Sequence, residues 1–306
     1  MSAMASDITS GAPLIEAHGL TKHYQDFSLE KVDLTVDEGE IVGFVGQNGA
    51  GKSTTIKALL GLTALDGGTA RILGTDVNDL ARGTATARIK EQIGVVFDTV
   101  SMPGHLRVAD VSRVHARAFS QWSPHLFDQL VREFGLGPNK QVKDLSRGMG
   151  MKLSLACALS HGARLLVLDE ATAGLDPMAR DEILDRLRAF VEEPGRAVLM
   201  SSHITSDLEK IADRVLCIES GRIVFDLAKD EITDEMGIAR CRVAEFEAVA
   251  ASGIIPEREL RYRRHDYGID LLVPDRFAFA RQFPNIPVDH MTIDDYMTLT
   301  LKGGVR

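Results

Sequence analysis

One short segment restricts the fold of this chain more than any other part of its sequence. The apolar run Ile41–Val45 leads into residues 46–53, GQNGAGKS, which fit the pattern G-x-x-x-x-G-K-[ST]. Farther along, Ile56, Leu59 and Leu60 share one face of an expected helix. A buried strand, a glycine-rich turn and a helix in this order predict a phosphate-binding loop in an α/β fold.

The chemistry of such a loop explains its residue types. Glycines let the backbone approach a polyphosphate closely, and the helix N-terminus adds roughly half a positive charge. Lys52 is expected to reach the β- and γ-phosphates, and Ser53 to offer its hydroxyl to Mg²⁺. The predicted nucleotide-binding residues of the loop are Gly46, Gln47, Asn48, Gly49, Ala50, Gly51, Lys52, Ser53 and Thr54.

The rest of the chain alternates between strand-like and helix-like patterns. Val32, Leu34 and Val36 alternate with polar neighbours, which indicates early half-buried β structure. Apolar runs of strand length follow at residues 93–97, 165–168, 197–200 and 215–218. One intervening helix is expected to bury Ile183, Leu184, Leu187, Phe190 and Val191. This alternation predicts an α/β domain with a parallel sheet.

A pair of carboxylates follows the run at residues 165–168. Asp169 is expected to hold the hydration shell of Mg²⁺, and Glu170 to polarise an attacking water as a general base. A small GTPase would need an N-K-x-D guanine reader, but Asn139-Lys140 is followed two places later by Val142. The sequence therefore predicts a nucleotide hydrolase of another class.

Further motifs in their order along residues 14–232 resemble the ATP-binding subunits of ABC transporters. Residues 145–149, LSRGM, occupy the place of the signature L-S-G-G-Q, and residues 173–177, AGLDP, resemble the D-loop. Residues 201–203, SSH, resemble the switch histidine, and Tyr24 the aromatic residue on which adenine stacks. A plain core tyrosine is the alternative for Tyr24.

This resemblance implies a specific domain organisation. Residues 1–232 are expected to form a P-loop NTPase of the ABC cassette type, with a RecA-like mixed sheet core and an antiparallel β subdomain. A helical subdomain at about residues 98–161 is inserted in it. Residues 233–306 are expected to form a small α+β accessory domain, with two strands around residues 265–268 and a helix at 293–301.

The resemblance also implies an activity, two cofactors and two partners. The chain is expected to bind ATP and Mg²⁺ and to hydrolyse ATP, with Glu170, His203 and Lys52 as catalytic residues. Two copies would close head to tail around ATP, and a separate integral membrane permease would dock on the helical subdomain. Ser146, Gly148 and Asp176 are expected to meet the nucleotide; taken alone, Ser146 also reads as an ordinary helix N-cap.

Two departures from the family pattern bear on this expectation. Asp98 stands where the family has a glutamine that touches Mg²⁺, so the predicted metal-binding residues are Ser53, Asp98 and Asp169. Arg147 replaces a glycine of the signature, and its charge faces either phosphate or solvent. These departures, with residues 202–209, resemble the YtrB-like subfamily that serves small bacterial ABC-2 type exporters.

Composition limits the partners and the place of action. The formal net charge of −9 speaks against direct nucleic-acid binding. No apolar run approaches the roughly 18 to 20 residues of a spanning helix, and Lys22, the first basic residue, comes too late for a secretory leader. A peripheral subunit at the cytoplasmic face of a bacterial membrane is therefore expected. The alternatives are a regulatory, weakly hydrolysing subunit and a soluble ABC ATPase; a single cassette without sustained heptads disfavours the latter.

Overall fold

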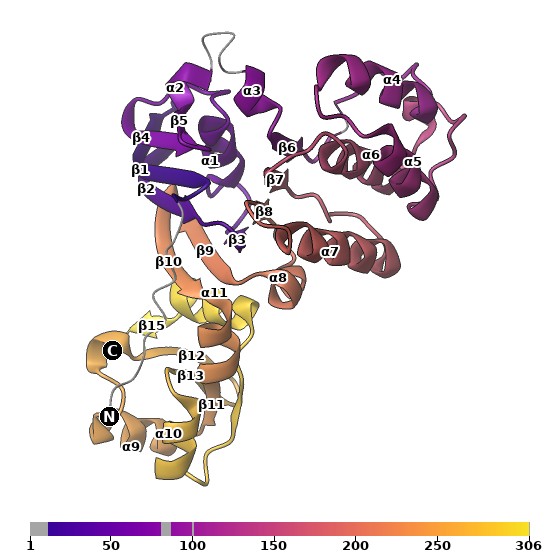
Figure 1. Cartoon of the computed structure of the whole chain (residues 1–306). Helices are drawn as coiled ribbons and strands as arrows, with labels where there is room; N and C mark the ends of the chain where they lie inside the picture. Colours follow the sequence, from indigo (N-terminus) through magenta and orange to yellow (C-terminus); the bar gives the residue numbers. More distant parts are fainter. Residues whose placement is uncertain (1–11, 81–86, 100, 306) are drawn as a thin grey trace, which may run out of the picture. The chain divides into compact units, whose positions relative to one another are not determined.

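The computed structural model describes residues 12–80, 87–99 and 101–305 of the 306-residue chain. It divides into two compact units (Figure 1), one of residues 1–204 and 216–225 and one of residues 205–215 and 226–306. The leader prediction rests partly on residues 1–11, which lie outside the described ranges. Within those ranges, no helix has the length and apolar character needed to cross a membrane.

A six-stranded sheet of order β10-β9-β3-β8-β7-β6 organises the first unit. Its strands are β3 (Ile41–Val45), β6 (Ile93–Val96), β7 (Leu165–Asp169), β8 (Ala197–Ser201), β9 (Arg214–Glu219) and β10 (Arg222–Ala228). Strands β3, β8, β7 and β6 run parallel, as the apolar runs predicted. Ser201 pairs with both Phe44 and Asp169, so the carboxyl ends of β3, β7 and β8 lie side by side.

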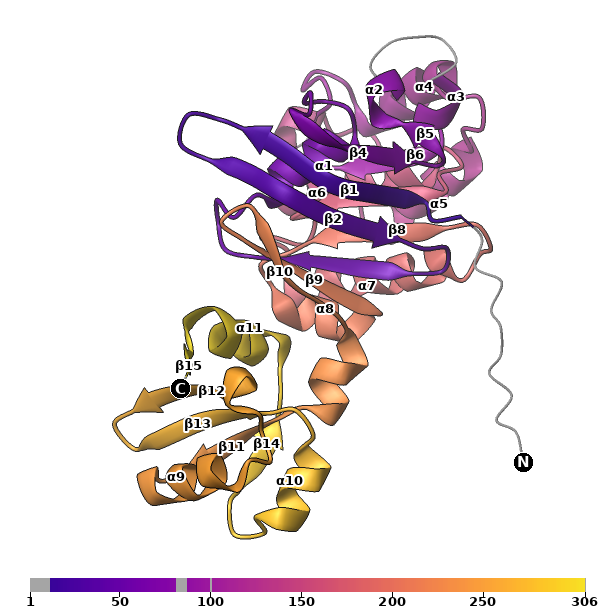
Figure 2. The ribbon, with the colours of Figure 1, turned by 90° about the vertical axis from the view of Figure 1, so that its left-hand side faces the viewer.

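The predicted antiparallel β subdomain is a second sheet, of order β2-β1-β4-β5. It contains β1 (Ile15–His23), β2 (Ser28–Val36), β4 (Gly67–Ile72) and β5 (Thr75–Asp76), and Figure 2 shows β1, β2 and β4 side by side. The alternating residues Val32, Leu34 and Val36 are buried, as predicted. Helix α1 (Lys52–Leu59) contacts both sheets and buries Ile56 and Leu59 in their shared core.

The other helices of the first unit are α2 (Val77–Leu80), α3 (Ala87–Lys90), α4 (Val108–Ala118), α5 (Pro124–Glu133), α6 (Arg147–Leu159), α7 (Pro177–Val191) and the 3₁₀ turn η2 (Val142–Asp144). Among them, α2 contacts β4 and β5, and α6 contacts β6. Helices α4, α5 and α6 lie between β6 and β7 in the sequence and group together in Figure 1. Helix α7 buries Ile183, Leu184, Leu187 and Phe190, so its predicted apolar face is confirmed apart from the half-exposed Val191.

The second unit is built on a five-stranded antiparallel sheet of order β14-β11-β13-β12-β15. Its elements are α8 (Thr205–Ile211), the π-helical turn η3 (Glu231–Glu235), β11 (Gly237–Cys241), α9 (Val243–Ser252), the 3₁₀ turn η4 (Glu257–Glu259), β12 (Arg261–His265), β13 (Gly268–Val273), α10 (Arg276–Gln282), β14 (Val288–His290), α11 (Ile293–Lys302) and β15 (Gly304–Val305). From β11 to β14 the order is the β-α-β-β-α-β of ferredoxin-like folds. Phe246 of α9 and Phe279 of α10 pack into one core with Leu271 of β13.

The sequence predicted only part of this second unit. The hairpin β12–β13 and helix α11 match the expected elements, and the small α+β fold is confirmed. Strand β11 was not predicted, because its GIARC sequence has no clear alternation; its five residues form a strand by pairing with β13. Strand β14 has only three residues, two of them polar, so its sequence alone gives no strand signal.

Candidate functional site

The phosphate-binding loop connects β3 to α1, and its shape depends on glycine. Gly46, Gly49 and Gly51 have φ angles of 155°, 82° and 122°, values that L side chains rarely adopt. A Cβ atom on Gly46 would lie 2.3 Å from the carbonyl oxygen of Ile218, and one on Gly51 2.8 Å from Cδ2 of Leu29. The loop therefore lies directly against the backbone of β9 at Gly46 and against side chains, Leu29 of β2 among them, at Gly51.

A cavity of about 570 Å³ opens in front of this loop. Loop residues form one part of its lining, and residues that follow β6, β7 and β8 form another. The lining residues are Asp26, Phe27, Gln47, Asn48, Gly49, Gly51, Lys52, Ser53, Thr54, Asp98, Arg147, Glu170, Ala173 and His203. Predicted residues from four separate parts of the sequence thus meet in one space.

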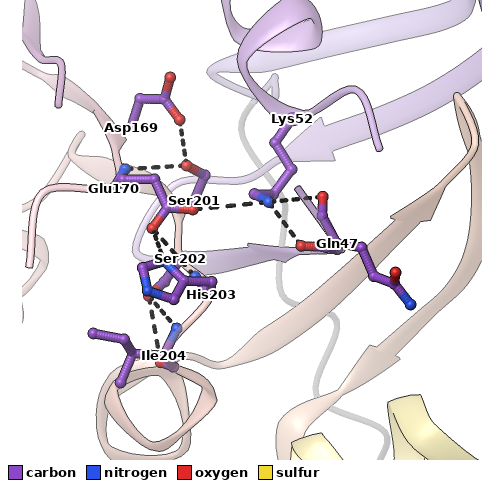
Figure 3. A network of polar contacts seen from close by, with 9 residues as sticks. Gln47, Lys52, Asp169, Glu170, Ser201, Ser202, His203 and Ile204 are labelled. Atoms are coloured by element: carbon purple, nitrogen blue, oxygen red, sulfur yellow. Dashed lines mark hydrogen bonds and ion pairs between the residues drawn. The ribbon is translucent and has the colours of Figure 1, made fainter. Parts of the chain in front are cut away.

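Lys52 lies buried at the back of this cavity. Its Nζ atom donates hydrogen bonds to the carbonyl oxygens of Gly46 (2.7 Å) and Gln47 (3.3 Å) and lies 3.7 Å from Oε1 of Glu170 (Figure 3). An ammonium group has three donors and no acceptor. A phosphate entering the cavity would therefore compete with two loop carbonyls and one carboxylate for the same cation.

Glu170 follows directly after β7 and adopts a left-handed backbone conformation with φ 55°. This conformation costs an L-residue roughly 1–2 kcal/mol. The Glu170 backbone N–H donates to the carbonyl oxygen and to Oγ of Ser201, both at 3.2 Å. Its Oε2 atom accepts from the backbone N–H of His203 at 3.3 Å and lies 2.5 Å from Nδ1 of that histidine. The carboxylate is thus held between Lys52 and His203.

Asp169 is the last residue of β7 and lies behind the cavity wall. It is 5% exposed, and its Oδ1 atom accepts a hydrogen bond of 2.6 Å from Oγ of Ser201 (Figure 3). Sequence reasoning did not single out Ser201 as an orienting group. The signal for it lay in the strand register, because Ser201 ends β8 directly beside Asp169.

The donor set suits Mg²⁺. The exposed residues Ser53 and Asp98 line the cavity, and Asp169 directly precedes the lining residue Glu170. In the described ranges, no group of three or more histidine, cysteine or acidic side chains is arranged to hold a metal unaided. Mg²⁺ usually keeps several waters and binds through one or two protein oxygens plus substrate phosphates, so hydroxyl and carboxylate oxygens in this number fit it.

Tyr24 lines a neighbouring cavity of about 590 Å³, which shares Gln47, Asn48 and Gly49 with the first. The tyrosine is 47% exposed, which rejects the alternative of a plain core residue. Nζ of Lys22 lies 5.7 Å from the centroid of its ring. Tyr24 therefore offers an aromatic surface beside the loop, as stacking on a base requires.

Apart from Arg147 and Ala173, the signature and D-loop residues do not line this cavity. Oγ of Ser146 accepts a hydrogen bond of 3.3 Å from Met149 N–H as the N-cap of α6, and Gly148 faces Leu175. Asp176 caps α7 by accepting from Ala179 N–H at 3.0 Å, a bond that lowers the pKa of its carboxyl group. Among the described residues, none of these three lines the cavity of its own chain, whereas Arg147 does.

Comparison with known proteins agrees with this geometry. Residues 29–173 match the family model described as "ABC transporter". The chain is 33% identical over 226 residues to the uncharacterized ABC transporter ATP-binding protein YhcH of Bacillus subtilis, which is 72% of each chain. It is 35% identical over 239 residues to the Nod factor export ATP-binding protein I of Burkholderia lata, which is 76% of each.

A solved structure shows the same fold. The dimeric post-hydrolysis state of the ATP-binding cassette MJ0796, bound to ADP and Pi, aligns with a TM-score of 0.63 at 22% identity. The alignment covers 70% of this chain and 98% of that one. The expected cassette fold is therefore confirmed.

Proposed function

Since this chain belongs to the ATP-binding proteins of ABC transporters, we propose that it hydrolyses ATP to drive movement of a substrate through a separate membrane permease. One observation carries the proposal. Lys52, Ser53, Glu170 and His203, from three separate parts of the sequence, line a single cavity in front of a phosphate-binding loop.

The proposed reaction uses these residues in distinct roles. The N–H groups of the loop and of the α1 N-terminus bind the phosphates, and Lys52 exchanges its loop carbonyls for β- and γ-phosphate oxygens. Glu170 accepts the proton of the attacking water, and His203 orients the carboxylate. Ser53, Asp169 and Asp98 would hold Mg²⁺, directly or through water, and the bound ion would neutralise charge on the phosphates.

A second copy would complete the nucleotide site. Ser146, Gly148 and Asp176 do not line the cavity of their own chain, and the α6 N-terminus presents backbone N–H groups suited to an anion. A nucleotide held by the partner's loop would satisfy these groups. The dimeric state of MJ0796 with ADP and Pi supports this arrangement.

We expect the permease to dock on the helical subdomain at the cytoplasmic face of a bacterial membrane. A cavity of about 460 Å³, lined mainly by apolar residues from β6, the segment between β6 and α4, α4 and α6, lies in this part of the first unit. Export through an ABC-2 type permease of the YtrB-like class is the finer proposal, and the export named for the Burkholderia lata relative supports it. Purification from membranes in mild detergent should recover an integral membrane protein; recovery of none would contradict the transport role.

The head-to-tail dimer can be tested with one substitution. We expect Glu170→Gln to hold ATP without hydrolysing it and to elute as a dimer in size-exclusion chromatography with Mg²⁺ and ATP, because the amide cannot accept the water's proton. Glu192→Gln is the control, since this exposed glutamate lies at the end of α7, outside the cavity. A Glu170→Gln protein that stays monomeric at saturating ATP would exclude the proposed dimer.

A weakly hydrolysing regulatory subunit is the second candidate. Two residues of the cavity lining favour this candidate. Asp98 stands where the family has a glutamine, and Arg147 stands where the signature motif has a glycine. ATP turnover of about 1 per second or more, with purified chain and Mg²⁺, would place the protein among ordinary enzymes and reject this candidate.

A further inference from the structure

Arg147 belongs to the signature motif and also lines the nucleotide cavity of the same chain. It is the first residue of α6, directly after the N-cap Ser146. Its side chain extends toward Gly174, where an added Cβ atom would lie 3.7 Å from Cδ and 3.9 Å from Nε and Nη1 of Arg147. These are ordinary van der Waals distances, so the Arg147 side chain packs against Gly174, and it lines the cavity together with Ala173 and Glu170.

The guanidinium group is exposed, and it has no hydrogen bond or ion pair with any described residue. Among the other charged groups of the cavity, Glu170 contacts Lys52 and His203, and Asp26 and Asp98 add two carboxylates to the lining. A guanidinium carries five N–H donors and stays charged at all relevant pH values. Arg147 thus presents an unused cation to the space in which a polyphosphate would bind.

The position on the wall selects one phosphate. The loop and α1 hold the phosphates nearest to them, whereas Glu170 must reach the water that attacks the terminal phosphate. Arg147 lines the same cavity as Glu170, and its side chain lies against Gly174, four residues after Glu170 in the sequence. Its guanidinium group therefore lies toward the segment that carries Glu170. Planar guanidinium groups bind two phosphate oxygens at once, a geometry that a lysine ammonium lacks.

We propose that Arg147 binds the γ-phosphate of the nucleotide held by its own chain, so that a single copy prefers ATP to ADP before a second copy joins. This inference rests on the proposed ATP binding. It assigns to the signature segment a contact within one chain, in addition to the contacts of Ser146 and Gly148 proposed across the dimer.

Calorimetric titration of monomeric protein tests the proposal, with a non-hydrolysable ATP analogue and with ADP, each with Mg²⁺. We expect Arg147→Ala to weaken binding of the analogue about tenfold and to change ADP binding by less than about twofold. Arg147→Lys should lose less affinity for the ATP analogue, because the lysine keeps the positive charge at the first residue of α6. Lys143→Ala is the matched control, an exposed cation of η2 outside the cavity, and should leave the ratio of the two affinities unchanged.

The possible results separate this inference from the proposed function. An unchanged ratio of affinities in both Arg147 variants would overturn it. So would a loss seen only in the dimer of the Glu170→Gln protein, because the contact would then cross between copies. If the unaltered chain bound neither nucleotide, the proposed function itself would fail, and this inference with it.

Discussion

Two glycines of the phosphate-binding loop have positive φ angles but different surroundings. A side chain on Gly46 would meet the Ile218 carbonyl at 2.3 Å, whereas one on Gly49 would meet nothing within 4 Å. Backbone strain therefore applies at both positions, and a steric clash with backbone applies only at Gly46. Substitutions at Gly46 and Gly49 can therefore separate the cost of backbone strain from the cost of a steric clash within one loop.

We expect Gly46→Ala to lower the free energy of unfolding by about 2–4 kcal/mol, since β3 and β9 must separate to admit the methyl group. Gly49→Ala should lower it by about 1–2 kcal/mol, the cost of the left-handed backbone alone. Urea unfolding of both variants measures the difference. Equal losses would show that the contact with Ile218 does not constrain the loop.

At the residue scale, the sequence predicted the site residues that belong to known motifs. It did not predict the side-chain directions and hydrogen bonds that depend on tertiary packing. Lys52, Glu170 and His203 were expected from their motifs, and the structure brings them into one cavity. The direction of the Arg147 side chain stayed open, because it depends on packing against the segment around Gly174, which is distant in the sequence. The bond from Ser201 to Asp169 depends on strand register, which no local pattern encodes.

At the level of the elements, two helices of the helical subdomain begin in the same way. Ser123 caps α5 by accepting from Leu126 N–H at 3.2 Å, and Ser146 caps α6 by accepting from Met149 N–H at 3.3 Å. Only Ser146 belongs to the signature motif. Stability and nucleotide contact can therefore be compared in two equivalent caps.

We expect Ser123→Ala and Ser146→Ala each to lower the free energy of unfolding by about 1 kcal/mol, because each loses one cap bond. Only Ser146→Ala should also abolish the ATP-dependent dimer of the Glu170→Gln protein, as judged by size-exclusion chromatography. Dimers that persist in the Ser146→Ala variant would reduce this serine to an ordinary N-cap.

Helices and buried strands were predictable from periodicity, since α7 and β7 carry their own apolar pattern. The short strands β11 and β14 were not, because pairing with neighbours supplies most of their stability. A strand that is stabilised mainly by pairing with its neighbours has no recognisable pattern in its own sequence.

Across the whole molecule, each unit has its own hydrophobic core. Leu59 and Leu199 belong to the core of the first unit, and Phe246 and Leu271 to that of the second. The chain enters the second unit at α8, leaves it, and returns at residue 226. Within that unit α8 contacts α11, and Oε1 of Glu209 accepts from Ile293 N–H at 2.8 Å.

Two cores predict two thermal transitions in calorimetry. Saturation with Mg²⁺ and a non-hydrolysable ATP analogue should raise the transition temperature of the first unit only. The free energy of unfolding of that unit should rise by about 2.7 kcal/mol when the analogue is at a hundredfold excess over its Kd. Ile293→Ala removes a fully buried side chain of α11. It should lower the transition temperature of the second unit only, by reducing the free energy of unfolding of that unit by about 2–5 kcal/mol. A single transition that responds to both changes would contradict independent cores.

The close approach of Gly46 to Ile218 extends the nucleotide site into a strand that carries none of its motifs. Random mutagenesis selected for altered ATP affinity should therefore return substitutions in β9 as well as in the loop. Redesign of the enzyme has to treat this strand as part of the binding machinery.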